Sequence, residues 1–567
     1  MPRRLILSFL LYSFCTALSA AEPPPGYAIA SAHPLATRAG LEILAKGGNA
    51  FDAAIAVSAA LAVVEPYHSG LGGGGFWLLH LAKTEQNIFV DGREVAPGAA
   101  TKTMFLSADG NQIPGLSLNG GLSAAIPGEP AALVYIAAHY GHLPLSESLA
   151  PAIRLAEKGF PVDPQLYYFL TMGDRLQQLQ KNPASAAIFL RQGRPYKIGE
   201  LFVQTDLGKT LREIAAKGHD GFYQGAVAEK LVSGINNAGG VWQLKDLASY
   251  QVKVRQPLEG NYKGMHIVTA PLPSAGGVAL ITMLNILSEY PLSSLKKVER
   301  IHYIVESMRL AYWQRGDLGD PDFIQTPISQ LLSPENAKKL RGNILPTKAT
   351  PSEALSQKNI MNLRPGETTH FSILDGDGNR VAATLSINYI FGSSVVAGGT
   401  GVLLNDHMDD FSIKVNVKNV FGLVGSEKNS IEPGKRPLSS MTPTFLEMPN
   451  RIAILGTPGG SRIPSMVLLA ALSFADSYGA ITMVSKMRFH HQYLPDVLVH
   501  EPNSFDTVLR HQLQVMGYHL NELQEYYGDM QAITWDKVLI TAASDPRHIG
   551  LASVVLKQNT GGYGVTH

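Results

Sequence analysis

Residues 53–64 constrain the fold of this chain more than any other segment. Ala, Ile, Val and Leu occupy every position of this stretch except Ser58. A helix that is apolar on all sides has to be buried on all sides, because no face of it can be left to water. We predict a helical stretch over residues 34–64 that is broken at Gly47-Gly48-Asn49. Asn49 or Asp52 can then serve as the N-cap of the second helix.

Strand-like and helix-like segments follow one another along the chain. Residues 334–365 are rich in Pro, Ser, Asn and Lys, and we expect an exposed segment there. Strands interleaved with very apolar helices indicate a layered fold in which both faces of a sheet are covered. The predicted strands are 27–32, 76–82, 87–90, 370–374, 380–387 and 451–455, and the further predicted helices are 131–140, 149–158, 207–217, 226–238, 298–314 and 464–478.

The first 21 residues have the pattern of a secretory signal peptide. Arg3 and Arg4 precede an apolar run over Leu5–Leu18, and Ser19-Ala20-Ala21 offers small residues for cleavage. The run is shorter than the ~20 residues of a membrane-spanning helix. The single cysteine, Cys15, lies inside this segment, so the mature chain would contain no cysteine and no disulfide. We therefore expect a periplasmic or secreted protein without stable membrane insertion.

The charge balance and the ligand-type residues exclude several classes of protein. The 47 Lys+Arg residues nearly equal the 46 Asp+Glu residues, and no basic block occurs, so nucleic acid is not an expected partner. Gly72–Gly75 lacks the Lys and the Ser or Thr of a phosphate-binding loop. No His, Cys or carboxylate spacing is typical of a metal site, and we interpret His490-His491 as structural. No metal or other cofactor is expected.

The segment Glu367-Thr368-Thr369-His370 is the most informative for chemistry. It opens a predicted hairpin whose turn is Asp375-Gly376-Asp377-Gly378-Asn379. A Thr-Thr pair alone is also common where an ordinary strand begins. Separate motifs along the chain are needed to decide between a structural and a catalytic threonine.

Several such motifs occur in the order found in one family. With them the sequence resembles the gamma-glutamyltransferase (gamma-glutamyltranspeptidase, glutathione hydrolase) family of bacterial type, from about Tyr27 to Arg547. Each motif is weak alone, and together they are highly specific. They are the helical region Pro34–Pro66, Asp91-Gly92-Arg93-Glu94, Thr368-Thr369-His370, Asn405–Phe411, Arg436-Pro437-Leu438-Ser439-Ser440-Met441, Pro458-Gly459-Gly460-Ser461-Arg462 and Ala543-Ser544-Asp545-Pro546-Arg547.

The resemblance implies an N-terminal nucleophile hydrolase that cuts its own precursor between Glu367 and Thr368. The products would be a large subunit, 22–367, and a small subunit, 368–567, which form a heterodimer. Both would share one domain of the α+β class, a four-layer αββα sandwich. A freed α-amine has a pKa of about 7.7–8.0, so that of Thr368 can accept the proton of its own hydroxyl.

Three further residues are expected to assist Thr368 on this resemblance. Ser386 stands where the family usually has a second threonine, and from the returning hairpin strand its hydroxyl can hydrogen-bond Thr368. Gly459 and Gly460 match the family's oxyanion motif, in which backbone N–H groups stabilise the negative charge of a tetrahedral intermediate. Alone, Pro458-Gly459-Gly460 would be interpreted as a turn.

The resemblance also implies a site for a γ-glutamyl group, which carries an α-carboxylate and an α-ammonium. Arg93 matches the residue that clamps the carboxylate, and its planar guanidinium suits two parallel hydrogen bonds. Ser439 and Ser440 match the serines that hold the same carboxylate. Asn388 and Asp410 match the residues that bind the ammonium. The simpler alternative is an exposed arginine paired with Asp91 or Glu94, beside an ordinary turn at 438–440.

Two positions depart from the family pattern. His407 stands where relatives often have Gln or Glu, and a protonated imidazole there would repel the substrate ammonium. Substrate affinity is therefore expected to fall at acidic pH. Phe421 stands where bacterial relatives often have a Tyr in a lid loop, here within Val415–Lys435, so the hydroxyl contact of that Tyr is lost.

The expected function is cleavage of the γ-glutamyl amide of glutathione and related compounds. The acyl group would form an ester with Thr368 and pass to water or to an amino-acid or peptide acceptor. One alternative is a cephalosporin-acylase-like amidase on the same scaffold, which would need a different acyl pocket. Another, of a different class, is a non-catalytic exported solute-binding protein, which would stay a single intact chain.

Overall fold

The computed structural model describes residues 23–355, 368–557 except 416, 418 and 424, and the backbone of 563–566. The predicted signal peptide and Glu367 lie outside these described residues. No helix in the described ranges is long and apolar enough to cross a membrane.

The first sheet has eight strands, and every neighbouring pair in it is antiparallel. Its centre is the predicted hairpin of β11 and β12, joined by the turn over 375–379. In spatial order the strands are β23 (Tyr563–Thr566), β22 (Leu551–Lys557), β1 (Gly26–Ser31), β11 (Thr369–Leu374), β12 (Arg380–Ser386), β2 (Gly74–Leu81), β3 (Gln86–Gly92) and β8 (Lys253–Arg255).

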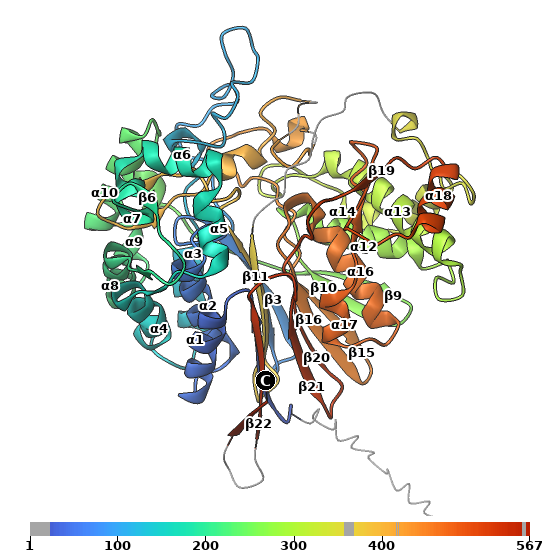
Figure 1. Ribbon diagram of the computed structural model, residues 1–567, viewed down its shortest axis with the longest axis horizontal. Helices are drawn as coiled ribbons and strands as arrows, with labels where there is room; N and C mark the ends of the chain where they lie inside the picture. The colour runs from blue at the N-terminus through green and yellow to red at the C-terminus, as the bar shows by residue number, and fades with distance from the viewer. Residues whose placement is uncertain are drawn as a thin grey trace, which may run out of the picture.

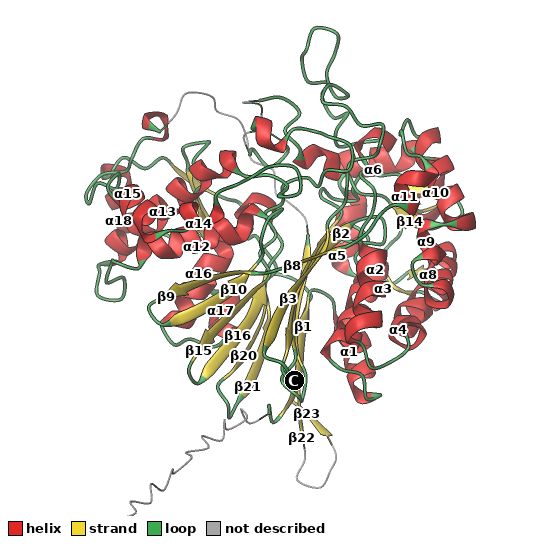
Figure 2. Ribbon diagram, turned by 180° about the vertical axis from the view of Figure 1, so that it is seen from behind, coloured by secondary structure: helices red, strands yellow, loops and turns green. Residues whose placement is uncertain are grey.

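The second sheet has six antiparallel strands and packs against the first, with β16 and β20 in contact with β11. Figure 2 shows the two sheets side by side in the middle of the molecule. In spatial order the strands are β21 (Ile540–Ser544), β20 (Gln531–Trp535), β16 (Arg451–Gly456), β15 (Thr444–Met448), β10 (Met265–Thr269) and β9 (Leu258–Tyr262).

Helices cover the outer side of each sheet (Figure 1). On the side of the first sheet, where α1, α2 and α3 contact its strands, are α1 (Pro34–Ala45), α2 (Ala50–Val64), α3 (Glu129–Tyr140), α4 (Leu145–Lys158), α5 (Pro164–Thr171), α6 (Gly173–Lys181), α7 (Pro183–Phe189), α8 (Thr205–Lys217), α9 (Asp220–Tyr223), α10 (Gly225–Asn237) and α11 (Leu244–Ala248). On the second lie α12 (Ala275–Leu287), α13 (Lys297–Trp313), α14 (Ile328–Leu331), α15 (Pro334–Arg341), α16 (Ile463–Ala475), α17 (Ala480–Ser485) and α18 (Thr507–Val515). The described part also has three short strand pairs and one small three-stranded sheet. The pairs are β4 (Phe160–Pro161) with β7 (Leu201–Phe202), β5 (Leu190–Arg191) with β6 (Arg194–Pro195), and β13 (Val396–Ala397) with β14 (Val402–Leu403). The small sheet consists of β17 (Phe489–His490), β18 (Leu498–His500) and β19 (Leu520–Glu522).

The apolar helix that constrains the fold is buried as expected. All residues of α2 are buried, and the helix contacts β11 and β12 on one side and α1, α3 and α4 on the other. The side chain of Asn49 accepts hydrogen bonds from the N–H groups of Phe51 and Asp52, and the Asp52 carboxylate accepts one from the N–H of Asn49. Asn49 is thus the N-cap of α2 in a capping box, which begins the helix at Ala50.

The segment over 334–365 is more ordered than its composition indicates, as far as it is described. Pro334–Arg341 forms α15, capped by the Ser333 side chain, and it buries Ala337 and Leu340. The serine cap and the proline at the start of the helix explain why this polar stretch becomes helical. Residues 356–365 lie outside the described part.

Both sheets take strands from both sides of Thr368. The first sheet combines β1, β2, β3 and β8, which precede it, with strands that follow it, and the second sheet combines β9 and β10 with later strands. A chain cut at Thr368 would therefore leave two segments that are held together by strand pairing.

Candidate active site

The central hairpin places Thr368 and Ser386 at the same end of the first sheet. Asp375 fixes the turn at the opposite end, because its carboxylate accepts hydrogen bonds from the N–H groups of Asp377 and Asn379. Thr369 then pairs with Leu385, so the next residue on each strand, Thr368 and Ser386, also lie together. The hydroxyl of Thr368 donates to that of Ser386 over 3.4 Å, and both side chains are buried.

Residues beside the two hydroxyls hold this end of the hairpin in place. The hydroxyl of Thr369 donates to Oε2 of Glu65 over 2.9 Å, which ties the first residue of β11 to the end of α2. The hydroxyl oxygen of Ser386 accepts the N–H of Asn388 over 2.9 Å. Asn388 itself has φ of 79°, a left-handed conformation that Asn tolerates better than most residues.

The Gly459-Gly460 pair forms a tight turn between β16 and α16. Both residues have left-handed φ angles, 137° and 55°, which other residues rarely adopt. Gly460 begins a short 3-10 helix, Gly460–Arg462, that leads directly into α16. The turn therefore presents bare backbone at the start of a helix, where N–H groups lack helical partners.

One small cavity, here called the threonine cavity, collects eight of the nine described residues that the sequence analysis proposed for the site. Gly459 is the exception and lines a second cavity beside it. Phe421 and His407, the two departures from the family pattern, also line the threonine cavity. Its complete lining is Arg93, Thr368, Ser386, Asn388, His407, Asp410, Phe421, Leu423, Ser439, Ser440, Met441, Gly460 and Ile463.

Arg93 is fully buried, which excludes the alternative of an exposed arginine. Its Nη2 lies 2.5 Å from Oδ2 of Asp410, and its Nη1 lies 3.3 Å from Oε2 of Glu94. Asp91 instead accepts hydrogen bonds from the N–H of Arg93 and from Nε of Arg255. The two residues proposed to bind opposite charges of a substrate thus form an ion pair with each other.

The serine pair reaches the cavity from a loop held by a second arginine. Nη1 of Arg315 donates to the carbonyl oxygen of Ser439 over 3.2 Å, and burial lowers the pKa of Arg315 to about 10. The hydroxyl oxygen of Ser439 accepts the N–H of Met441 over 3.1 Å. Each serine hydroxyl can still donate one hydrogen bond to an anion in the cavity.

His407 lies between the cavity and a buried carboxylate. Its Nδ1 is 2.8 Å from Oε1 of Glu94, and both residues are buried. Burial and the neighbouring Arg93 lower the pKa of His407 below its ordinary value, although Glu94 and Asp410 act in the opposite direction. Burial raises the pKa of Glu94, but His407 and Arg93 bring it below its ordinary value. His407 is therefore neutral and Glu94 ionised near neutral pH.

Phe421 covers one wall of the cavity from the loop after Asp410. Its side chain is buried, and its carbonyl oxygen accepts a hydrogen bond from Nε2 of Gln492 over 3.2 Å. The N–H of Phe421 donates to Oδ1 of Asn419, whose Nδ2 donates to Asp410 over 3.4 Å. Phe421 has no hydroxyl to hold this loop, and hydrogen bonds of its backbone hold the loop instead.

Five residues at this site were not predicted from the sequence. Leu423, Met441 and Ile463 line the cavity. Arg315 holds the serine loop, and Glu94 pairs with both His407 and Arg93. Glu94 directly follows Arg93 in the motif that identified the arginine, so that motif was a usable signal. Arg315 belongs to no motif. It lies in the short 3-10 helix Gln314–Asp317 that follows α13, and only the packing of this segment brings it near Ser439.

The adjacent histidines 490 and 491 are buried and have protein partners. Nδ1 of His490 lies 2.7 Å from the hydroxyl of Ser465, and Nε2 of His491 lies 3.1 Å from Oδ1 of Asp496. Burial lowers their pKa values to about 3 and about 4, so both are neutral. Within the described ranges no group of three His, Cys, Asp or Glu residues could hold a metal ion.

The fold is shared with solved structures of two enzymes. Cephalosporin acylase from Bacillus halodurans has the same fold with a TM-score of 0.83 at 27% identity, and the match covers 96% of this chain and 99% of that one. The gamma-glutamyltranspeptidase of Helicobacter pylori matches with a TM-score of 0.55 at 42% identity, over 57% of this chain and 93% of that one.

The chain belongs to the gamma-glutamyltranspeptidase family, whose family model matches residues 36–555. The glutathione hydrolase proenzyme of Pseudomonas sp. (strain A14) is 43% identical, over 86% of each chain. That of Escherichia coli (strain K12) is 38% identical, over 96% of this chain and 98% of its own length. The predicted family and enzyme class are therefore confirmed, and the alternative of a non-catalytic binding protein is excluded.

Proposed function

We propose that this enzyme cuts its own chain before Thr368 and then transfers γ-glutamyl groups from glutathione and related amides through an ester with that threonine. The single observation that carries this proposal is the threonine cavity, in which one hydroxyl nucleophile faces an arginine and an aspartate. The products of processing, 22–367 and 368–567, would form a heterodimer. Its two sheets and outer helix layers would then be an αββα sandwich of the N-terminal nucleophile type.

The Arg93–Asp410 ion pair supports recognition of an amino-acid group. The cavity holds only 20 Å³ of free volume, about enough for one water molecule. A γ-glutamyl group is larger than this, so the cavity has to widen to bind it, and we propose that it does so as Arg93 and Asp410 separate. The substrate carboxylate then pairs with Arg93 and the substrate ammonium with Asp410, so neither buried charge is left unpaired.

The chemistry at Thr368 needs a base, an oxyanion site and an ordered hydroxyl. After processing, the free α-amine of Thr368 accepts the proton of its hydroxyl as the oxygen attacks the amide carbon. The N–H groups at Gly459 and Gly460 stabilise the negative oxygen of the intermediate. Ser386 orients the hydroxyl through the contact already described. The α-amine then returns the proton to the leaving amine, and an ester remains.

The amidase alternative differs in the charge of its acyl group. A glutaryl group has the carboxylate of a γ-glutamyl group but no ammonium, so it gains nothing from Asp410 and Asn388. We expect kcat/KM for γ-glutamyl-p-nitroanilide to exceed that for glutaryl-p-nitroanilide by about 10- to 100-fold, because a charge-assisted hydrogen bond contributes about 1.5–3 kcal/mol. Equal rates for the two donors would support the amidase and contradict the γ-glutamyl assignment.

The place of action is also proposed. The first 21 residues have the signal-peptide pattern, and we propose that the enzyme is exported to the periplasm or the medium. Its partners are then small γ-glutamyl compounds and amine acceptors outside the cytoplasm.

The pH dependence of KM tests the role of His407. The charged groups facing its imidazole are Arg93, Glu94 and Asp410. Because the pKa of His407 lies below its ordinary value of about 6.5, repulsion of the substrate ammonium begins only below that pH. We expect KM for the γ-glutamyl donor to be constant from about pH 6.5 to 8 and to rise below about pH 6.5.

Two controls separate this effect from other titrations. The glutaryl donor has no ammonium, so its KM should not rise in the same way at acidic pH. In a His407→Gln variant the rise for the γ-glutamyl donor should disappear. A rise that persists in His407→Gln would show that another group causes it.

A further inference from the structure

The side-chain amide of Gln492 makes all the hydrogen bonds that an amide can make. Gln492 follows β17 and is 4% exposed. Its Nε2 donates to the carbonyl oxygens of Phe421 over 3.2 Å and of Leu494 over 3.3 Å. Its Oε1 accepts from the hydroxyl of Ser461 over 2.7 Å and lies 3.0 Å from Nε2 of His490. Both donors and both acceptor positions are occupied, so this buried amide has one fixed orientation.

The ring of His490 supports this orientation of the amide. Burial lowers the pKa of His490 to about 3, so the imidazole is neutral and has one N–H group. Its Nε2 faces the amide oxygen of Gln492, which can only accept. Its Nδ1 lies 2.7 Å from the hydroxyl of Ser465, which can donate. The proton of the ring is therefore on Nε2, and His490 helps to hold the oxygen of Gln492 in place.

The oxygen end of the amide holds the Gly459-Gly460 turn. Ser461 directly follows Gly460 in the short 3-10 helix after β16. Its hydroxyl donates to Gln492, and its carbonyl oxygen accepts a hydrogen bond from the hydroxyl of Tyr312 on α13. Ser461 is thus held at its side chain and at its main chain. Because Gly460 is bonded to Ser461, this hold also limits how the N–H groups of the turn can move.

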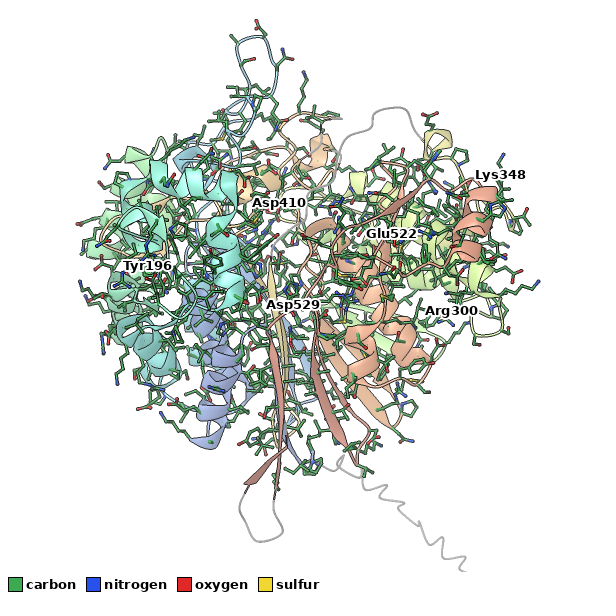
Figure 3. All side chains as sticks on the ribbon, viewed as in Figure 1. Tyr196, Arg300, Lys348, Asp410, Glu522 and Asp529 are labelled. Atoms are coloured by element: carbon green, nitrogen blue, oxygen red, sulfur yellow. The ribbon has the colours of Figure 1, made fainter. Side chains whose placement is uncertain are left out.

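The nitrogen end of the amide holds the loop that covers the threonine cavity. Phe421 lines that cavity and belongs to one apolar cluster with Tyr312 and Tyr493. Two residues earlier in this loop, Asn419 donates to Asp410, which Figure 3 shows in the upper middle of the molecule, between the two groups of helices. The free volume of the cavity, 20 Å³, is too small for a γ-glutamyl group, so its lining has to move when a donor enters.

We propose that Gln492 is a positioning residue that couples the cover of the donor site to the Gly459-Gly460 turn. This inference rests on the proposed function. While Phe421 lies over a bound γ-glutamyl group, the amide of Gln492 holds Phe421 with its nitrogen and Ser461 with its oxygen. When Phe421 moves away to admit or release a ligand, the amide loses one partner and holds Ser461 less firmly. The turn is therefore best ordered while the donor is covered, which is when the tetrahedral intermediate forms.

Donor kinetics of single variants test this coupling, with γ-glutamyl-p-nitroanilide as donor and p-nitroaniline release measured per processed chain. Ser461→Ala breaks only the contact with the turn, so kcat should fall about fivefold and KM should change less than about twofold. A fivefold change corresponds to about 1 kcal/mol, the usual contribution of one hydrogen bond. Gln492→Leu loses the contacts with both Ser461 and Phe421, so kcat should fall and KM should rise, each about fivefold.

Double variants separate coupling from independent effects. Gln492→Leu with Ser461→Ala should have the kcat of Gln492→Leu alone, because the contact between the two residues can be lost only once. Gln492→Leu with Phe421→Ala should have the KM of Phe421→Ala alone, because no ring is left to be held. The inference is overturned if the two effects multiply in either pair, or if Gln492→Leu leaves both constants within about twofold of the unchanged enzyme.

Gln204→Leu is the matched control for the loss of a buried amide. Gln204 is also 4% exposed, and its Nε2 donates to the carbonyl oxygen of Val63 over 2.7 Å. It does not line the threonine cavity, so kcat and KM should stay within about twofold. If Gln492→Leu does not fold or is not processed, Ser461→Ala decides alone, and an unchanged kcat in that variant overturns the inference.

The unchanged enzyme shows whether the inference or the function beneath it fails. If it releases no p-nitroaniline, the proposed function and the coupling both fail. If it releases p-nitroaniline and neither Gln492→Leu nor Ser461→Ala changes the rate, only the coupling fails.

Discussion

Thr368→Ala is expected to give a single uncut chain with at least about 1,000-fold lower turnover of γ-glutamyl-p-nitroanilide, since nucleophile loss costs at least this much in comparable hydrolases. The variant lacks the hydroxyl that attacks the preceding peptide bond in the precursor and the donor amide in the processed enzyme. Denaturing electrophoresis and p-nitroaniline release measure the two effects on one preparation.

Thr368→Ser is the matched control for this variant. It keeps the hydroxyl but loses the β-methyl that restricts the side-chain rotamer, so processing and turnover should be slower but measurable. Ser386→Ala should leave some processing, because Ser386 orients the nucleophile without replacing it. A Thr368→Ala chain that still splits at this position, or still turns over, would contradict the mechanism.

Arg93→Gln is expected to lower kcat/KM for γ-glutamyl-p-nitroanilide about 100-fold, mainly through KM, because a charged partner of the donor carboxylate is lost. With 4-aminobutanoyl-p-nitroanilide, which lacks that carboxylate, the same substitution should cost little. A loss of equal size with both donors would show that Arg93 does not bind the carboxylate.

Loss of the Arg93–Asp410 ion pair also affects the stability of the fold, and this effect has to be measured separately. Arg93→Gln leaves Asp410 without its cationic partner, and breaking a buried pair costs about 3–5 kcal/mol of stability. Arg93→Gln with Asp410→Asn removes both charges and should recover part of the loss in the free energy of unfolding. It should not recover KM. Recovery of KM together with stability would mean that the pair is only structural.

The hairpin and the apolar helix could be predicted from local sequence because their signals are local. Residues 375–379 supply a turn between two strand-like runs, and residues 53–64 have no polar face. The order of motifs then identified the family, and the fold brought eight of the nine described site residues to one cavity.

The second sheet and α12 could not be predicted in the same way. Only β16 of the six strands was expected, because the others are short and lack clear alternation. α12 contains Gly276 and Gly277, which weaken a helix signal. Packing requires them, since a Cβ at these positions would lie 2.0 Å from Oγ1 of Thr442 and 2.1 Å from the carbonyl oxygen of Ala270.

Contacts between distant residues were also beyond the reach of sequence patterns. Arg93 and Asp410 were both assigned to the substrate, but nothing in their spacing shows that they pair with each other. The contact of His407 with Glu94 is of the same kind. The burial of His407 and its neighbour Arg93, which lower its pKa and set the pH range of its protonation, also depend on packing. Such pairs are set by the packing of the loop after β14 against the end of β3.

The central claim is that Thr368 becomes the N-terminal residue and carries the γ-glutamyl group. The most direct test is N-terminal sequencing and mass measurement of the smaller chain of the purified enzyme, before and after acid quenching with γ-glutamyl-p-nitroanilide. We predict a chain that begins at Thr368 and gains the mass of one γ-glutamyl group on that residue. An intact chain that still turns over the donor, or a γ-glutamyl group on another residue, would contradict the claim.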